Sequence, residues 1–254
     1  MKKSITLSVL PEFKKHLILE EKSQATIEKY LRDVKAFLKY AGDEAITKES
    51  VVEYKNYLMP RYKIRSINSM LASLNCLFAY LNLNELKVKF LKLQQSVFCP
   101  EEKELTKEEY IRLCKTAKQN HNERLNLILQ TICGTGIRVS EIKYITVKTV
   151  RDGEVIVNSK GKIRTVFIVK ELRQKLLCYA KTQGIKSGMI FVTKTGKPIC
   201  RTNIWKEMKA LCEEANVNPK KVFPHNLRHL FARVFYSIEK DIARLADILG
   251  HSSI

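Results

Sequence analysis

The chain has 254 residues, a length that suits two small domains better than a single one. Apolar residues make up 45% of it and charged residues 28%, an ordinary globular balance that argues against a disordered or fibrous protein. Its 46 Lys and Arg outnumber its 26 Asp and Glu, so the formal net charge is +20. Such a charge repels itself, and nucleic acid is the commonest polyanion that would offset it.

The excess positive charge is spread over both halves of the chain. Residues 1–100 contain 17 basic and 10 acidic side chains, and residues 101–254 contain 29 and 16. A single basic tail would have placed the excess at one end. The distribution therefore predicts that two parts of the protein face the same polyanion.

No membrane or export segment is indicated by the sequence, and the cysteines form no pattern typical of a metal site or of disulfides. The apolar run at residues 5–10 is far shorter than a bilayer span and stops at Pro11. The seven cysteines are odd in number and include no Cys-x-x-Cys pair. We therefore expect reduced thiols, no metal and no membrane contact in a cytoplasmic protein.

The first part of the chain, residues 1–95, is predicted to be a small bundle of four helices. Apolar residues recur there at helical spacing, and Gly42 and Pro60 mark helix ends. The predicted helices span residues 11–21, 26–41, 47–58 and 65–83. After them the periodicity fades, and we assign residues 96–104 as a linker.

The second part, residues 105–254, mixes helices with a small antiparallel sheet. A capping box at Thr106 and Glu109 indicates where it begins. Two β-rich runs joined by Ser-Lys-Gly read as a hairpin, at residues 154–158 and 162–169. The predicted helices span residues 106–118, 122–133, 138–145, 170–182, 201–215, 225–237 and 240–249, with a short apolar run at 189–192. The predicted fold is thus mainly α with a small antiparallel sheet.

Four short motifs in the second domain carry side chains suited to phosphate chemistry. Arg138 follows a Gly-rich turn in GTGIRVSE, and Lys160 lies at the tip of the predicted hairpin in SKGK. His225 and Arg228 are three residues apart in PHNLRH, so they share one face of a helix. His251 follows a glycine helix stop in LGHS. Taken alone, each of these residues can also be explained by an ordinary structural role, as a surface cation, a turn lysine or a partner of a helix dipole.

Taken together, the order and spacing of these motifs resemble the tyrosine recombinase (phage integrase) family over essentially the whole chain. The blocks GTGIRVSE, SKGKIR, HNLRH and LADILGHSS lie at family-like separations. The resemblance implies a helical core-binding (SAM-like) domain followed by an α+β catalytic domain. It also implies a site-specific recombinase that cuts and rejoins double-stranded DNA through a 3′-phosphotyrosyl intermediate, as a homotetramer. Covalent attachment conserves the phosphodiester energy, so neither ATP nor any other cofactor is expected.

The resemblance assigns roles to the motif residues. Arg138 and Arg228 would hold the non-bridging oxygens of the scissile phosphate, since planar guanidiniums bind them bidentately. Lys160 would be the general acid that protonates the leaving 5′-oxygen, with a pKa lowered by the arginines. His225 would be the acid/base histidine beside the nucleophile, and His251 a hydrogen-bond donor to the phosphate.

Two further assignments concern the carboxylate and the nucleophile. Glu141, one turn after Arg138, is expected to orient a residue of the site. The nucleophilic tyrosine is expected a few helical turns beyond the last histidine and therefore beyond Ile254. Tyr236 comes closest in sequence to the motifs, but we assign it to the core. The 254-residue chain is accordingly expected to bind DNA without forming the covalent intermediate.

Several interpretations stay open at this point. Within the family, a bacterial mobile-element integrase is favoured over a chromosome-resolving recombinase or an integron integrase, with accessory DNA-bending or directionality factors and a place at the nucleoid. A type IB topoisomerase-like enzyme would share the chemistry but relax DNA without choosing a site. A natural end at residue 254 would instead favour a non-catalytic DNA-binding protein. A tyrosine codon soon after codon 254 would decide for the enzyme.

Overall fold

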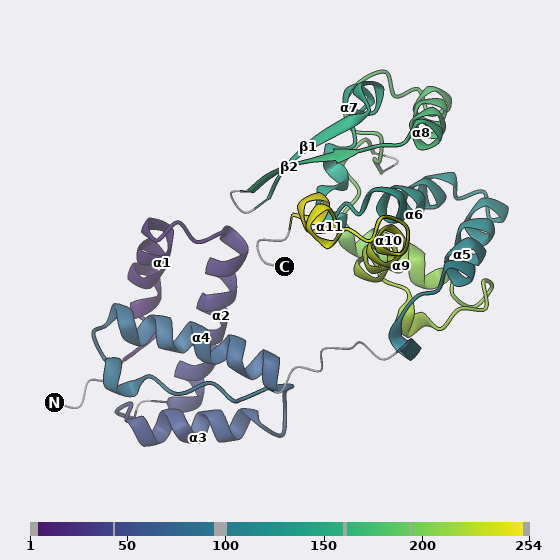
Figure 1. Cartoon of the computed structure of the whole chain (residues 1–254). Coiled ribbons are helices and arrows are strands. Elements are labelled where there is room, and N and C mark those ends of the chain that lie inside the picture. The colour runs from purple at the N-terminus through teal and green to yellow at the C-terminus, as the bar shows by residue number, and fades with distance from the viewer. Residues whose placement is uncertain (1–4, 43, 94–100, 160–161, 194, 251–254) are drawn as a thin grey trace. The chain divides into compact units, whose positions relative to one another are not determined.

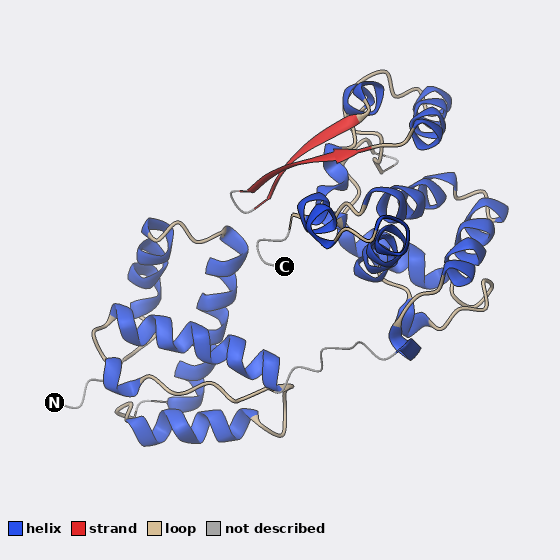
Figure 2. Cartoon of the chain, viewed as in Figure 1, coloured by secondary structure: helices blue, strands red, loops and turns tan. Residues whose placement is uncertain are grey.

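The computed structural model divides the chain into two compact units, Met1–Val97 and Phe98–Ile254, each with its own hydrophobic core (Figure 1). Helices dominate both units, and the strands of the described residues form one hairpin in the second unit (Figure 2). The predicted fold class, mainly α with a small antiparallel sheet, is confirmed. The structure describes residues 5–42, 44–93, 101–159, 162–193 and 195–250.

The first unit contains the four predicted helices. Its elements are α1 (Val9–Leu19), α2 (Gln24–Ala41), α3 (Lys48–Leu58), α4 (Ile64–Tyr80) and the 3₁₀ turn η1 (Asn84–Leu86). The side chain of Ser23 caps α2, and Gly42 ends it with φ 65°. Helix α1 begins two residues before the predicted start, because Pro11 lies in its first turn, where the missing N–H has no intrahelical partner to lose.

The second unit surrounds one central helix with four others. Its elements are η2 (Glu101–Lys103), α5 (Lys107–Gln119), α6 (Glu123–Thr135), η3 (Val139–Tyr144), α7 (Val147–Asp152), β1 (Glu154–Ser159), β2 (Lys162–Phe167), α8 (Lys170–Thr182), α9 (Arg201–Ala210), η4 (Pro219–Lys221), α10 (Pro224–Glu239) and α11 (Ile242–Leu249). Helix α6 contacts α5, α8, α9 and α10 and is buried on most of its faces. No helix among the described residues is long and apolar enough to cross a bilayer.

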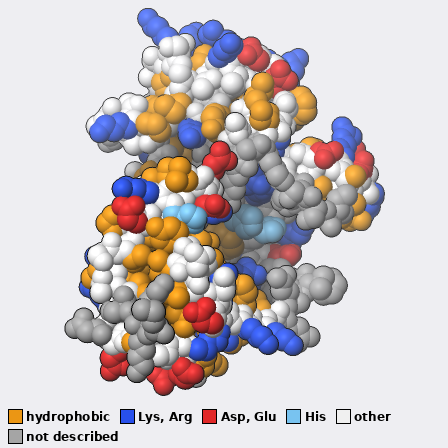
Figure 3. Space-filling model, turned by 90° about the vertical axis from the view of Figure 1, so that its left-hand side faces the viewer, with side chains coloured by type: hydrophobic (Ala, Val, Ile, Leu, Met, Phe, Trp, Pro, Cys, Tyr) orange, Lys and Arg blue, Asp and Glu red, His pale blue; other side chains and the backbone are white. Residues whose placement is uncertain are grey.

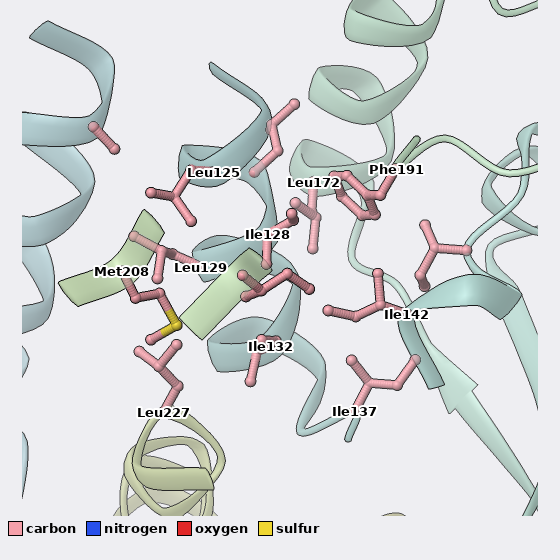
Figure 4. Packing of buried hydrophobic residues seen from close by; sticks show 14 of the residues in the cluster. Leu125, Ile128, Leu129, Ile132, Ile137, Ile142, Leu172, Phe191, Met208 and Leu227 are labelled. Atoms are coloured by element: carbon pink, nitrogen blue, oxygen red, sulfur yellow. The ribbon is translucent and has the colours of Figure 1, made fainter. Parts of the chain in front are cut away.

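The core of the second unit is packed around α6, as Figure 4 shows. Side chains of α6 point toward those of α8, α9 and α10, so the elements that carry the motif residues are fixed to one scaffold. The labelled members are Leu125, Ile128, Leu129 and Ile132 of α6, together with Ile137, Ile142, Leu172, Phe191, Met208 and Leu227. The C-terminal end of α6 leads directly into the turn that contains Arg138.

The hairpin pairs β1 with β2 in an antiparallel register in which Val155 lies opposite Val166 and Val157 opposite Arg164. Alternate side chains of a strand point to opposite faces. The inner face buries the three valines and also Arg164, which is 9% exposed. The outer face leaves Ile163 and other apolar side chains exposed to solvent. An arginine therefore occupies a core-facing position of the sheet.

Two expectations about local structure are wrong. The predicted helix at 138–145 is the 3₁₀ element η3, followed by the unpredicted α7, because the side chain of Thr146 caps a new helix. The predicted helix at 201–215 ends at Ala210 and continues as turns. Those turns still bury Leu211, Cys212 and Ala215, so the apolar pattern continues where the helix does not.

Candidate active site

Three of the expected site residues lie together on the wall of one cavity of about 530 Å³. Arg138 comes from the turn between α6 and η3, whereas His225 and Arg228 come from the first turns of α10. The other lining residues come from η3, α9, the N-cap of α10 and its first residue: Val139, Ser140, Arg201, Thr202, Trp205, Phe223 and Pro224. The cavity therefore gathers cationic and aromatic side chains from three separate parts of the second unit.

A glycine allows the Arg138 turn to pack closely. Gly136 has φ 65°, a left-handed conformation that side chains with a Cβ rarely adopt. A Cβ there would lie 2.6 Å from the Phe231 ring of α10 and 3.0 Å from Leu249 of α11. The second glycine of GTGIR thus has a packing reason, because it brings the end of α6 against both C-terminal helices.

Arg228 is 3% exposed, although it carries a charge. Its Nη1 donates to the carbonyl oxygen of Gly136, and its Nη2 donates to the carbonyl oxygen of Leu249. Burial, which is the largest cause, and the nearby charges of Arg138 and Arg164 together lower the pKa of this guanidinium to about 10. An anion arriving in the cavity would offset this repulsion.

Arg138 is the more accessible of the two arginines, with a side chain that is 36% exposed. Its Nη1 donates to Glu141 Oε1 at 3.0 Å, and its backbone N–H donates to Glu141 Oε2 at 2.8 Å. Its Nη2 donates to the carbonyl oxygen of Leu249 at 3.3 Å, so Arg138 and Arg228 share one acceptor. The side chain of Glu141 is 3% exposed and fixes both the turn and the guanidinium.

The C-terminal end of α11 supplies acceptors for three arginines. The last carbonyl groups of a helix lack intrahelical partners and carry partial negative charge. The Leu249 carbonyl accepts from Arg138 and Arg228, and the Ile248 carbonyl accepts from Arg164 Nη1 at 2.6 Å. This helix end and one carboxylate therefore hold three guanidiniums close together.

His225 is exposed at the edge of the same cavity. Its ring centroid lies 4.4 Å from that of His229, with the ring planes at 73°. The partial burial of the ring lowers the pKa of His225, and the neighbouring charges of His229, Arg228 and Arg138 act in the same direction. The imidazole is therefore neutral at neutral pH, in the form that can accept a proton.

Lys160 and His251 lie outside the described residues. Tyr236 is 45% exposed, so its assignment to the core is wrong. The reason is that the C-terminal half of α10 extends past the core, and Ile238 on the same half is 72% exposed.

Sequence reasoning missed two residues that line the cavity and one that contacts Glu141. Arg164 pairs with Glu141 at 2.5 Å, and the alternation along its strand already indicated an inward position. Arg201 and Trp205 line the cavity from α9, and Trp205 is 45% exposed with Lys209 Nζ 5.4 Å from its ring centroid. The signal there was a lone tryptophan within a basic stretch.

The site is suited to anion binding by cations alone. Two arginines line a cavity whose edge carries a neutral histidine, a combination that can hold a phosphate and move a proton. Among the described residues, no three His, Cys, Asp or Glu side chains are grouped so that they could hold a metal ion.

Comparison with known proteins identifies relatives over the whole chain. The model of the Phage integrase family matches residues 103–254, and the model of the phage integrase N-terminal SAM-like domain matches residues 10–84. The tyrosine recombinase XerA of Pyrococcus furiosus is 29% identical over 264 residues, which cover 99% of this chain and 88% of that protein. The XerA of Thermococcus kodakarensis is 30% identical over 256 residues, covering 97% and 87%.

A solved structure shares the fold. A lambda integrase tetramer bound to a Holliday junction aligns with a TM-score of 0.77 at 20% identity, covering 98% of this chain and 78% of the lambda integrase chain. At this identity the likeness concerns the fold.

Proposed function

The chain belongs to the phage integrase family and is a site-specific tyrosine recombinase, and we propose that it cuts and rejoins DNA for a bacterial mobile element through a 3′-phosphotyrosyl intermediate. The observation that carries the proposal is the pair Arg138 and Arg228, whose guanidiniums share the Leu249 carbonyl at one cavity wall. Two planar guanidiniums that share one acceptor suit the two non-bridging oxygens of a phosphodiester, where negative charge grows during cleavage.

The proton transfers are assigned to other residues of the motifs. His225, neutral because its pKa is lowered, would take the proton of the attacking tyrosine hydroxyl. Lys160 would donate a proton to the leaving 5′-oxygen, and His251 would donate a hydrogen bond to the phosphate. Glu141 would keep Arg138 oriented through the contact at 3.0 Å.

The nucleophile is proposed to be a tyrosine that follows Ile254, as the family resemblance implies. This assignment is supported by the cavity that holds Arg138 and Arg228, since none of its described lining residues is a tyrosine. The attack would join the tyrosine oxygen to the phosphorus as the bond from phosphorus to the 5′-oxygen breaks. The reverse reaction by a free 5′-hydroxyl would restore the DNA backbone.

The proposed partners are double-stranded recombination sites and further copies of the protein. A net charge of +20 supports DNA as the ligand, and lysines and arginines are spread over the face shown in Figure 3. The tetrameric assembly of lambda integrase on a Holliday junction supports a homotetramer on DNA. Accessory DNA-bending or directionality factors and a place at the nucleoid in the cytoplasm complete the proposal.

The proposal is tested by looking for a covalent adduct. The protein, with any residues that its reading frame encodes after Ile254, is incubated with nicked duplexes taken from the DNA on either side of that reading frame. We expect a denaturation-resistant protein–DNA band that Arg138→Lys and Arg228→Lys abolish. Arg124→Lys, which changes an arginine paired with Glu207 away from the cavity, should leave the band. Relaxation of supercoiled plasmid that lacks any target site would contradict site-specific recombination.

A further inference from the structure

Arg164 is a buried charge whose contacts reach three elements of the second unit. It lies on β2, its Nη2 donates to Glu141 Oε2 at 2.5 Å, and its Nη1 donates to the Ile248 carbonyl at 2.6 Å. Its side chain is 7% exposed, so it does not offer its charge to the solvent. Through Glu141, which contacts Arg138 with its other oxygen, it is linked to the Arg138 turn.

Gly250 fixes the place of Arg164 against the end of α11. A Cβ at this glycine would lie 2.6 Å from Arg164 Cδ and 3.2 Å from Arg164 Nε. The same close approach explains why Arg164 Nε is buried without a hydrogen-bond partner. A buried N–H without a partner costs free energy, and the two Nη contacts act against this loss.

We propose that Arg164 is a positioning residue that keeps Arg138 turned toward the phosphate by sharing Glu141 with it. With Arg164 present, the Glu141 carboxylate is occupied from two sides, and Arg138 contacts it through one guanidinium nitrogen only. Without Arg164, Glu141 Oε2 keeps only the backbone N–H of Arg138 as a donor and can accept a guanidinium nitrogen of Arg138 as well, since paired N–H groups of arginine favour bidentate contact. The guanidinium would then turn away from the cavity.

Arg164 has a second effect, because it also binds the end of α11. The Leu249 carbonyl is the acceptor shared by Arg138 and Arg228, and it adjoins the Ile248 carbonyl that Arg164 holds. Lysine cannot replace these contacts, since its single ammonium group lacks the fixed fork that reaches Glu141 and Ile248 at once. The inference rests on the proposed role of Arg138 in phosphate binding.

The test is a titration of the 254-residue protein with inorganic phosphate, followed through the NMR signals of ¹⁵N-labelled arginine side chains. Arg164→Lys is compared with Arg124→Lys, a matched control. Arg124 also pairs with a carboxylate, Glu207, also donates to a backbone carbonyl, Val192, and also has a buried Nε without a partner. We expect Arg164→Lys to shift the Arg138 signal and to weaken phosphate binding about tenfold, the lower end of the loss when a residue that orients a ligand-binding group is changed.

A double substitution separates positioning from a structural role. If Arg164 acts through Arg138, then Arg138→Ala/Arg164→Lys should bind phosphate no more weakly than Arg138→Ala alone. Losses that add in the double variant, or an Arg164→Lys protein that binds phosphate as Arg124→Lys does, would overturn the inference. An Arg138→Ala protein with unchanged phosphate binding would instead overturn the proposed function.

A further variant covers the case in which Arg164→Lys does not fold. Glu141→Gln/Arg164→Gln removes both charges of the buried pair, so neither partner of that pair is left as an uncompensated charge. We expect this protein to be folded and to bind phosphate more weakly than the wild type. Wild-type phosphate binding by this folded variant would overturn the inference.

Discussion

Glu141 is the carboxylate that two of the clustered arginines contact, and this position explains its importance for the site. Arg138 and Arg164 each donate to one of its oxygens, and its side chain is 3% exposed. The guanidiniums of Arg138, Arg164 and Arg228 repel one another, and their charges produce a positive electrostatic potential at the cavity. A site of this kind is organised before an anion arrives, which is how electrostatic stabilisation avoids reorganisation during the reaction.

Glu141→Gln should therefore lower the stability of the second unit. Removing one partner of a buried ion pair leaves the other charge uncompensated, which costs about 3–5 kcal/mol in the free energy of unfolding. Urea unfolding measures this loss. The control is Glu207→Gln, whose pair with Arg124 has both side chains 25% exposed and which should cost much less. Equal losses would mean that the arginine cluster adds nothing to the cost.

The pKa of His225 should lie below the ordinary histidine value of 6.5. Burial and the charges of His229, Arg228 and Arg138 disfavour its protonated form, so as pH falls the unfolded chain takes up this proton first. Stability is thus present above pH 6.5 and declines as pH falls through the lower folded pKa.

The titration of His225 can be measured by NMR of its ring protons. His229→Gln should raise the pKa of His225, because one neighbouring positive charge is removed. His121→Gln, at the end of α5, should leave it unchanged. DNA cleavage that needs a neutral His225 should decline only below the measured pKa. A His225 pKa above 6.5 would contradict its assignment as a neutral base.

At the scale of elements, the site depends on how helix ends meet. Gly136 is the C-cap of α6 and Gly250 is the C-cap of α11, both with positive φ, and each glycine lies against a residue from another element. Gly136 lies against Phe231 and Leu249, while Gly250 lies against Arg164. The glycines of two sequence motifs thus set the distances between the elements that carry the arginines.

Gly250→Ala should destabilise the second unit more than Gly184→Ala. Both glycines have a left-handed conformation, at φ 64° and 68°, and an alanine there costs roughly 1–2 kcal/mol. A Cβ at Gly184 meets nothing within 4 Å, whereas one at Gly250 displaces Arg164. Thermal unfolding should show the difference, with hydrogen exchange of α11 increased only in Gly250→Ala. An equal shift for both variants would exclude the Arg164 contact as the cause.

For the whole molecule, the relevant property is the distribution of charge over two units with separate cores. Residues 1–100 and 101–254 each carry an excess of basic side chains. Lysines and arginines that contact phosphates release counterions, so affinity depends on the salt concentration. Both units are therefore expected to contribute to DNA binding.

We expect the logarithm of the DNA affinity to fall linearly with the logarithm of the salt concentration, at about 0.9 per phosphate contacted. Fluorescence anisotropy with a labelled duplex gives this slope for the whole chain and for the two units made separately. Each unit should show a shallower slope than the whole chain. DNA binding by only one of the two units would contradict the expectation that both units contact DNA.

Much of the fold was determined by the local sequence. Apolar spacing and capping residues predicted the helices of the first unit, the hairpin, and α8 at its observed bounds, Lys170–Thr182. These features depend on residues a few positions apart, which is the range over which propensity, capping and periodicity act. The order of the four motifs likewise needed no coordinates, because it is a property of the chain.

Only the tertiary structure decided which residues share the site. Arg138 and Leu249 are 111 residues apart and Arg164 and Ile248 are 84 apart, so no local pattern could join them. Tertiary packing also left Tyr236 exposed. The physical reason is that a buried arginine needs hydrogen-bond acceptors. The carbonyl and carboxylate groups that accept from these arginines are brought close by folding, although they are distant in sequence.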